Sequence, residues 1–577
     1  MTDCVEGTSH IGTNACKLET IPPPRPRSGP ASVTAITLRF LRLEQCPRYA
    51  LFQPVGGRRG NRAIHIDRRN FLELAAGLVA LAGGGEGAVA AANGLRFGPP
   101  QPFSYEGLRD LARKRAGEPY APPPRPAPAI VQNIDFDAIQ KIKFRADCAL
   151  WKDGAMPVRF FHLDKFNGEP VAVHAVENGQ ARPVLYEKDD FIYGDSSLAA
   201  RLPDDLGFSG FRVLNSRDSD IDWLAFQGAS YFRSCGPRGQ YGTSARGVAV
   251  NTAMPQPEEF PRFSQFWLSE SRDALNTVTI YALLEGQSVT GAYRFEASRG
   301  ASVVMTVHAE LFARTDVPRL GLAPLTSMFW YGENNRRSAI DWRPEVHDCD
   351  GLAMWTGKGE HIWRPLIDPP SVLTNSFVDV DPKGFGLLQR DHVFDDYQDD
   401  GAFYDRRPSV WVETIGRWGA GSVQLIEIPT EDEIHDNIVA YWTPQKPVKA
   451  GDNFALDYRL YWQDDEPHPS DLARVIATRV GRGGVPGQPV PPNRWKFVID
   501  FHGGPLAAMA PRYDIKPVVT LSRGKVHTPY VVKVVGTDRW RGFFDVALDS
   551  KEPVDMRCYL RLGEQTLSET WLYQFYP

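Results

Sequence analysis

Short apolar runs separated by turn residues dominate the chain from about residue 143 onward. Residues 277–284, 303–312 and 454–462 are rich in β-branched and aromatic side chains and are bounded by Gly, Pro or Asp. Such runs are typical of β-strands. Long amphipathic helical patterns are rare in this region, and many short strands at close spacing indicate an antiparallel sandwich. The pattern therefore predicts an all-β fold with a sandwich of more than 300 residues.

Two short segments before this region have helical patterns. Residues 104–116 place Leu108, Leu111 and Ala112 on one face, which predicts a helix. Residues 135–142 predict a second, shorter helix, and a Pro-rich connector at 119–128 separates the two.

A loose Gly- and Pro-rich stretch at 481–492 predicts a domain boundary. We place a linker at 471–492, with a large β-sandwich domain at 97–470 before it. Strand-like runs follow the linker and predict an immunoglobulin-like sandwich at 493–577; they lie at 497–501, 530–535, 543–548, 556–560 and 570–575. A chain of 577 residues has room for more than one domain.

Residues 67–92 have the three parts of an export signal. Arg68 and Arg69 form the charged end, nine apolar residues follow at 74–82, and Ala88-Val89-Ala90 resembles a cleavage site. The pattern predicts a twin-arginine signal peptide, engagement with the twin-arginine translocase, and delivery to the periplasm; a buried internal helix is the alternative. Nine apolar residues are too few to cross a bilayer, which needs ~20, so we expect no stable membrane insertion.

Residues 1–66 are rich in Pro and Arg and show no clear periodicity. We expect this extension to be disordered. It reflects either a start codon assigned too far upstream or a genuine extended leader.

Composition narrows the function only a little. The chain has 65 basic and 70 acidic residues, so nothing favours nucleic acid as a partner. After residue 90 the cysteines are isolated and form no metal-binding or redox motif; they are Cys148, Cys235, Cys349 and Cys558. The sequence does not decide whether two of these cysteines form one disulfide bond in the periplasm. The 14 Trp, 20 Tyr and 31 Phe would suit stacking on sugar rings, although sheet cores account for most of them.

Common nucleotide, serine-hydrolase and zinc-protease motifs are missing from the sequence, which leaves carboxylates as the candidate chemistry. They gather at 327–363, 381–413 and 434–442. The first cluster mixes Trp, Arg, Asn and Asp without apolar periodicity, which predicts a polar loop system that lines a cleft and is not a buried strand; a solvated surface loop is the alternative. Inverting hydrolysis of a glycosidic bond needs one protonated carboxylic acid and one carboxylate, ~6.5–9.5 Å apart. The sequence pattern does not choose the pair.

Several motifs in order give the chain a family resemblance over residues 97–577. They are GFSGFR at 207–212, GASYFR at 228–233, YGTSARG at 241–247, TSMF at 326–329, HD at 347–348, GFGLLQ at 384–389, RPS at 407–409 and ETWLYQ at 569–574. With these motifs the chain resembles the periplasmic osmoregulated glucan biosynthesis proteins of the D and G type. The arginine pair favours the D type.

This resemblance implies a large N-terminal sandwich of the galactose-mutarotase-like supersandwich type with a carbohydrate cleft, and a C-terminal immunoglobulin-like sandwich. It also implies a role in making β-1,2-linked glucans, with a functional link to a membrane glucan synthase. Some members resemble inverting endo-β-1,2-glucanases or transglycosylases. On this resemblance Asp436 is the general acid and Asp348 the general base.

We expect the glucan chain to contact aromatic and polar side chains of these clusters, namely Trp330, Tyr331, Arg336, His347, Trp355, Trp363, Arg390, Tyr404, Arg407 and Trp411. Trp330 and Trp342 are candidates for excluding water from the site, with an ordinary cleft-wall role as the alternative. No metal or organic cofactor is indicated. The rival hypotheses are a non-catalytic glucan-binding chaperone that guides chains from the synthase to branching or modifying enzymes, and a structural envelope protein.

Overall fold

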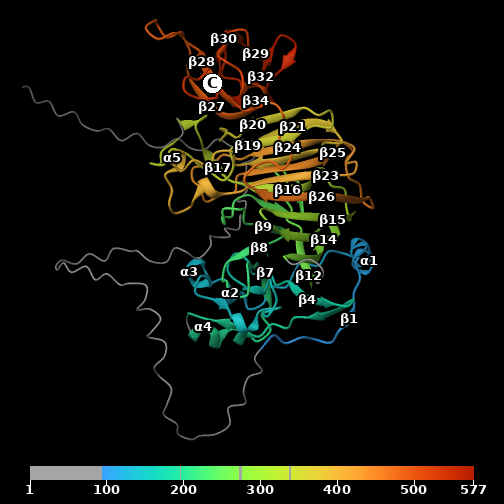
Figure 1. Ribbon diagram of the computed structural model, residues 1–577. Coiled ribbons are helices and arrows are strands. Elements are labelled where there is room, and N and C mark those ends of the chain that lie inside the picture. Colours follow the sequence, from blue (N-terminus) through green and yellow to red (C-terminus); the bar gives the residue numbers. More distant parts are fainter. Residues whose placement is uncertain (1–93, 195, 272–275, 337–338) are drawn as a thin grey trace, which may run out of the picture. The chain divides into compact units, whose positions relative to one another are not determined.

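The computed structural model describes residues 94–194, 196–271, 276–336 and 339–577 (Figure 1). The predicted signal peptide at 67–92 and the extension at 1–66 lie outside the described residues. Two large sheets and a smaller one form most of the described chain, so the predicted all-β fold is confirmed.

The largest sheet is antiparallel except at the β4–β12 and β20–β34 pairs, which are parallel. In spatial order its strands are β1 (Gln101–Pro102), β5 (Gln180–Pro183), β4 (Ala172–Glu177), β12 (Arg262–Glu270), β13 (Thr277–Glu285), β14 (Val289–Arg299), β15 (Val303–Ala313), β26 (Asn453–Gln463), β23 (Ser409–Ile415), β22 (Gly384–Leu388), β19 (Gly351–Trp355), β20 (His361–Pro365), β34 (Thr570–Phe575), β32 (Val554–Leu562) and β29 (Lys516–Leu521), with β33 (Gln565–Thr566) beside β32.

The second sheet runs in the order β21 (Leu373–Val380), β24 (Ala420–Glu427), β25 (Ile438–Pro444), β16 (Leu320–Ser327), β10 (Ser244–Arg246), β9 (Tyr231–Ser234), β8 (Asp222–Gln227), β7 (Phe208–Leu214) and β3 (Val158–His162), with β11 (Val248–Val250) paired to β16. A four-stranded sheet contains β27 (Arg474–Arg482), β28 (Arg494–His502), β31 (Trp540–Ala547) and β30 (Lys525–Lys533). Two small ladders pair β17 (Phe329–Tyr331) with β18 (Val346–His347) and β2 (Lys143–Phe144) with β6 (Phe191–Ile192).

Helices are short and few in the described ranges. They are α1 (Tyr105–Ala116), α2 (Pro128–Val131), α3 (Phe136–Ile139), α4 (Ser196–Arg201) and α5 (Phe394–Tyr397), with 3-10 turns η1 (Ala146–Cys148), η2 (Lys188–Asp190), η4 (Tyr404–Arg406) and η5 (Gly504–Leu506). The helix predicted at 104–116 is confirmed, and Ser104 caps it by accepting a hydrogen bond from the Gly107 amide at 3.1 Å. None of the described helices is long and apolar enough to span a membrane.

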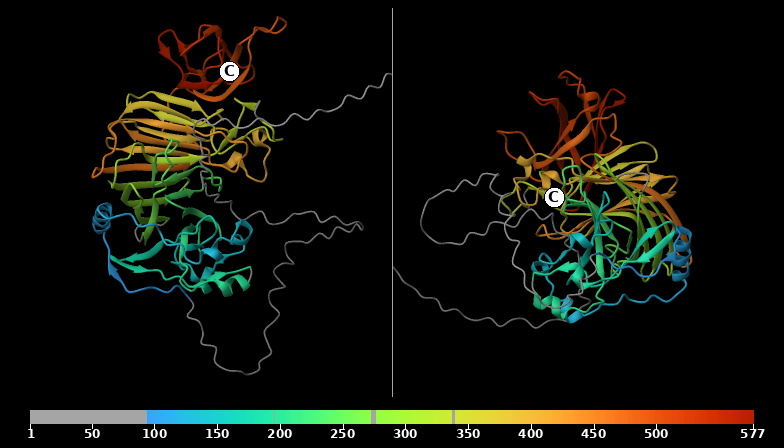
Figure 2. Two further views of the ribbon diagram at one scale, coloured as in Figure 1. Left: turned by 180° about the vertical axis from the view of Figure 1, so that it is seen from behind. Right: turned by 60° about the horizontal axis from the view of Figure 1, so that its bottom comes forward.

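The main core lies between the two large sheets (Figures 1 and 2). Phe226 stacks on Phe211 and Phe232, with ring centroids 5.2 and 5.0 Å apart, and Trp442 and Trp462 are fully buried. Alternate residues of β14 and β15 face this core, as the period of a strand requires. The periodic runs seen in the sequence are therefore the strands that carry the core.

A second core belongs to the C-terminal sandwich. The four-stranded sheet contributes Phe497 and Trp540, and the β34–β32 end of the largest sheet contributes Trp571. The same cluster includes Trp363 and Trp411 of β20 and β23. The C-terminal sandwich is therefore joined to the large sheet both by strand pairing and by a shared apolar core.

Two segments expected to be loops contain strands. β27 occupies residues 474–482 of the predicted linker, because Val475 and Thr478 are buried in the C-terminal sandwich. Within the cluster at 327–363, predicted to be loop, β19 and β20 are neighbouring strands of the large sheet, and Leu352 is fully buried. Their polar neighbours concealed the short apolar runs.

Candidate active site

Asp348 lies directly after β18 and is 5% exposed. Its backbone amide donates to the Met328 carbonyl at 2.8 Å, which fixes it beside β17. The carboxylate forms an ion pair with the Arg407 guanidinium, which lies over the Tyr404 ring at 4.4 Å. Asp348 is therefore a buried carboxylate with one cationic partner and a rigid backbone.

Asp436 lies in the loop before β25, and the next residue fixes that loop. The buried Asn437 side chain donates to the carbonyls of Phe329 at 2.9 Å and Ile428 at 2.8 Å, and it accepts from the Phe329 amide at 2.9 Å. Phe329 belongs to β17, which pairs with the β18 strand that precedes Asp348. The Asn437 bonds thus fix Asp436 to the same small ladder that positions Asp348.

The charge of Asp348 raises the pKa of Asp436. Burial and the nearby Asp348 charge raise the pKa of Asp436 to about 7, against the opposing charges of Arg233 and Arg407. Burial also raises the pKa of Asp348, while Arg407, His347 and Arg233 oppose that rise. A carboxyl group with a pKa near 7 can give up and regain a proton at neutral pH, as general acid catalysis requires. Neighbouring carboxyls in unlike environments commonly mark an acid and base pair.

Arg233 supplies positive charge from the second sheet. It lies on β9 and packs over the Tyr241 ring at 4.5 Å. The Tyr241 hydroxyl donates to Asp222 at 2.5 Å. Sequence motifs included Arg233 and Tyr241, yet sequence reasoning gave them no role.

Arg343 forms ion pairs with three acidic side chains, and one of these lies on the loop that carries Asp436. It is 9% exposed and forms a two-pronged pair with Asp341, at 2.9 and 3.1 Å. It also contacts Asp399 at 2.7 Å and Glu433 at 2.8 Å. Glu433 accepts a further hydrogen bond from the Tyr404 hydroxyl. The loop that carries both Glu433 and Asp436 is therefore held by charge-assisted bonds, which are stronger than neutral ones.

A cavity of about 440 Å³ lies between the β17–β19 region and β27, and its wall includes His347, the residue before Asp348. Its wall is strongly acidic and includes Glu333, Glu345, Asp350, Asp391 and Asp396. Burial and the Glu345 charge raise the pKa of Glu333 to about 8, and burial and the Asp350 charge raise the pKa of Asp391 to about 8. Across the described ranges, no set of three or more His, Cys, Asp and Glu side chains is arranged to hold a metal ion.

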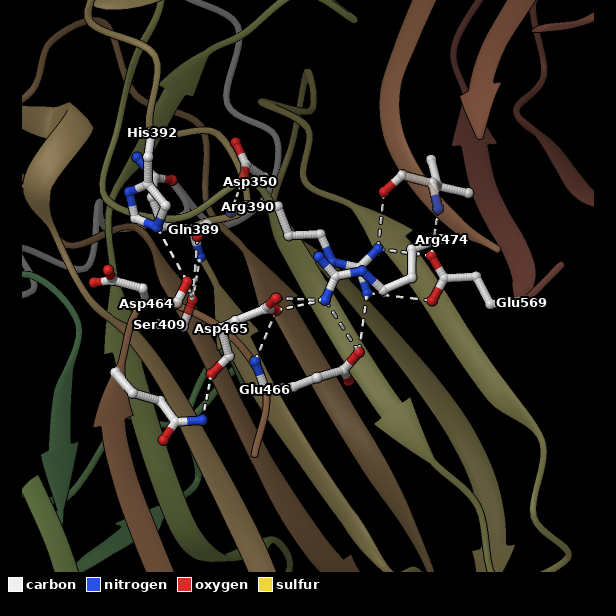
Figure 3. A network of polar contacts seen from close by, with 12 residues as sticks. Asp350, Gln389, Arg390, His392, Ser409, Asp464, Asp465, Glu466, Arg474 and Glu569 are labelled. Atoms are coloured by element: carbon white, nitrogen blue, oxygen red, sulfur yellow. Dashed lines mark hydrogen bonds and ion pairs between the residues drawn. The ribbon is translucent and has the colours of Figure 1, made fainter. Parts of the chain in front are cut away.

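The Arg390 side chain forms contacts that join the two sandwiches (Figure 3), and it is also part of the cavity wall. The predicted contact of this side chain with substrate stays a prediction. Its guanidinium forms a two-pronged ion pair with Glu569, at 2.6 and 3.2 Å, and donates to the Val475 carbonyl at 2.9 Å. It also packs 3.7 Å from the centre of the Trp363 ring. Glu466 lies 3.9 Å away on the other side.

Two of the aromatic residues predicted to bind glucan are packing residues. Trp411 is 1% exposed, because its ring lies where Gly384 and Gly386 have no side chain. Tyr331 is fully buried, and its hydroxyl donates to the Arg343 carbonyl at 3.0 Å. Both rings pack inward in this structure, and their predicted contact with glucan stays a prediction.

The remaining predicted residues lie in varied surroundings. Trp355 is half-buried, stacks on His361 at 5.2 Å, and has the Lys383 ammonium 4.5 Å from its ring centre. Arg336 is exposed. Trp330, His347, Trp363 and Tyr404 are buried. Sequence reasoning missed Arg343, Glu433 and Asn437 as site residues, and only their place next to the acids in the sequence could have indicated them.

Taken together, the fold and the site define an all-β sandwich protein in which the charge of a buried acid, Asp348, raises the pKa of a second acid, Asp436. Residues 103–575 match the family model of the periplasmic glucan biosynthesis protein MdoG. The chain is 50% identical over 503 residues to glucans biosynthesis protein D 2 of Ralstonia nicotianae, an overlap that covers 84% of this chain and 93% of the relative. It is 46% identical over 526 residues to glucans biosynthesis protein D of Xanthomonas campestris, covering 89% and 98%. The chain therefore belongs to the periplasmic glucan biosynthesis family.

Proposed function

We propose that this protein is an inverting enzyme that hydrolyses or rearranges β-1,2-glucan in the periplasm. The observation that carries this proposal is the Asp436–Asp348 pair. Asp436 has a pKa of about 7 and holds a proton over much of the neutral range, while Asp348 is ion-paired with Arg407. A protein that only bound glucan would have no use for such an acid.

Bond cleavage in this proposal involves two proton transfers. Asp436 gives its proton to the glycosidic oxygen as the bond from the anomeric carbon to that oxygen breaks. Asp348 accepts the proton of the attacking hydroxyl group as that oxygen bonds to the anomeric carbon from the opposite face. Water as the attacking group gives hydrolysis, and a sugar hydroxyl gives a transglycosylation product.

Trp330 and Trp342 are the residues that select between these outcomes in our proposal. Trp330 is 8% exposed, whereas Trp342 is 73% exposed on a turn held by the Asp341–Arg343 pair. An indole projecting from a fixed turn offers an apolar face to a pyranose ring. Covering the site in this way excludes water and favours transfer.

Export by the twin-arginine translocase and a functional link to a membrane glucan synthase belong to the same proposal. They rest on the predicted signal at 67–92 and on the family. The description of the family names periplasmic glucan biosynthesis, which supports a periplasmic place of action.

The test is incubation of the protein with linear β-1,2-glucan, followed by analysis of chain length and of cyclic products. Wild-type protein should produce shorter or rearranged chains. Asp436→Asn should abolish turnover and keep glucan affinity within about tenfold, because the amide retains the shape but not the proton. Asp514→Asn, at an exposed site on the C-terminal sandwich, is the matched control and should turn over normally.

Two results would count against the proposal. Folded wild-type protein that binds the glucan and leaves it unchanged would favour the chaperone hypothesis. Normal turnover by Asp436→Asn would place the acid elsewhere.

A further inference from the structure

The His347 ring is enclosed on both faces. The residue is 1% exposed, and its ring stacks on Phe329 at 5.4 Å and meets the Tyr397 edge at 5.2 Å. Such packing fixes the ring plane, so each ring nitrogen has one set of partners. The charge of the ring then follows from what those partners are able to accept.

Nδ1 faces the side-chain oxygen of Gln389 at 3.1 Å. The orientation of that amide is fixed, because its nitrogen lies 2.9 Å from the Tyr397 hydroxyl oxygen and 3.1 Å from the Tyr404 carbonyl. The Tyr397 hydroxyl itself donates to the Asp391 carbonyl at 3.1 Å, so its oxygen accepts from Gln389. Turning the amide over would set two carbonyl oxygens against each other. Nδ1 therefore carries a hydrogen.

Nε2 faces carboxylates. Glu345 lies 3.0 Å away and Asp350 3.6 Å away. The other oxygen of Asp350 accepts from the backbone amides of Arg390 and Asp391, the latter at 2.9 Å. These bonds and the His347 charge favour the ionised form of Asp350, while burial raises its pKa. Nε2 therefore carries a hydrogen as well, and a ring with hydrogens on both nitrogens is an imidazolium.

We propose that His347 is a permanently charged imidazolium at neutral pH and a positioning residue that keeps the neighbouring Asp348 ionised. The part concerning Asp348 rests on the proposed function, in which Asp348 is the base. The ionisation of His347 rests on its hydrogen bonds alone.

The surrounding charges agree with this assignment. Burial opposes protonation, but the hydrogen bond to Glu345 and the charges of Asp350, Glu345 and Glu333 raise the pKa of His347 to about 9. His347 in turn lowers the pKa of Asp348, as Arg407 and Arg233 do. His347 therefore stays charged through the neutral range, and Asp348 gains a third positive charge besides those of Arg407 and Arg233.

The direct test is nitrogen NMR of protein labelled with 15N-histidine, at pH 8. Ordinary histidines, with pKa near 6.5, are neutral there, whereas His347 should retain the signals of an imidazolium. His347→Gln should remove that charged signal. His162→Gln is the matched control, because burial lowers the pKa of His162 to about 4 and its variant should remove a neutral ring. Loss of a neutral ring signal from His347→Gln would overturn the inference. If that variant fails to fold, His347→Asn makes the same assignment.

Kinetics test the role toward Asp348. In His347→Gln the acidic limb of the pH profile of glucan turnover should move upward by up to about one unit, since removing a nearby opposite charge raises a carboxyl pKa. An unmoved limb at reduced rate would overturn the positioning role. Wild-type protein without any turnover would reject the proposed function, while the NMR measurement would still decide the charge of His347.

Discussion

The Arg390–Glu569 ion pair leads to a prediction of how strongly the stability of the two sandwiches depends on their contact. Both side chains are 3% exposed, and the pair joins the end of β22 to the start of β34. Glu569 also accepts from the Val475 amide at 2.7 Å. Glu569→Gln keeps an acceptor for that amide but removes the charge. Removing one partner of a buried pair costs about 3–5 kcal/mol, because the other charge stays buried.

The expected loss of unfolding free energy in Glu569→Gln lies at the lower end of this range. Glu466 is 3.9 Å from Arg390, and burial and the Glu569 charge raise its pKa to about 7. It ionises more readily once the negative charge of Glu569 is gone, and can then partly replace Glu569 beside Arg390. Urea unfolding followed by tryptophan fluorescence measures the loss, and calorimetry should show the C-terminal sandwich melting earlier.

The matched control is Asp514→Asn, which removes an exposed pair with Arg512 and should leave the free energy of unfolding nearly unchanged, because solvent screens the pair. The double variant Glu569→Gln with Arg390→Gln should be more stable than Glu569→Gln alone, since no unpaired charge remains. The reasoning is refuted if Glu569→Gln unfolds like the control, or if the double variant is the least stable of the three.

Three further predictions concern the cavity and the acid loop. Glu333 has a pKa of about 8 in the folded protein, above its ordinary value, so the native state binds more protons than the unfolded state, and stability falls as the pH rises from about 4.5 to 8. Glu333→Gln should flatten this part of the stability curve and, in urea unfolding at pH 8, raise the free energy of unfolding by about 1–3 kcal/mol. Asn437→Ala should lose about 1–3 kcal/mol, because three buried backbone groups lose their partner, and should slow glucan turnover more than it weakens binding. Trp342→Ala should leave stability within about 0.5 kcal/mol, since the ring is exposed, but should raise the ratio of hydrolysis to transfer in product analysis. A sloping Glu333→Gln curve, an Asn437→Ala variant as stable as wild type, or an unchanged product ratio would each contradict the corresponding prediction.

Local patterns were sufficient for the elements of the fold. The alternating pattern predicted β13, β15 and β26, and an amphipathic stretch beginning at Ser104 predicted α1. These elements could be predicted because their patterns and caps depend on residues that are close in the sequence. The β19 strand was missed, since five residues flanked by charges do not show a period.

Side-chain roles in the site required the three-dimensional structure. Arg390 looks like a substrate ligand in its own segment, but its partner Glu569 is 179 residues away. Trp411 looks like a stacking platform, but the two glycines that make room for its ring show that it packs inward. The sequence shows which side chains are present. Whether such a side chain binds a ligand or contacts a residue far away in the sequence depends on how the folded chain packs.

The position of β34 has a consequence for the order in which this protein is completed. Residues 570–575 lie between β20 and β32, so one of the last segments to be synthesised becomes an interior strand that bridges both sandwiches. A chain that stops before Thr570 leaves two unpaired strand edges, which invite pairing with other chains. Translation must therefore be almost finished before the large sheet can close, and a truncated product would tend to aggregate instead of persisting as a shortened protein.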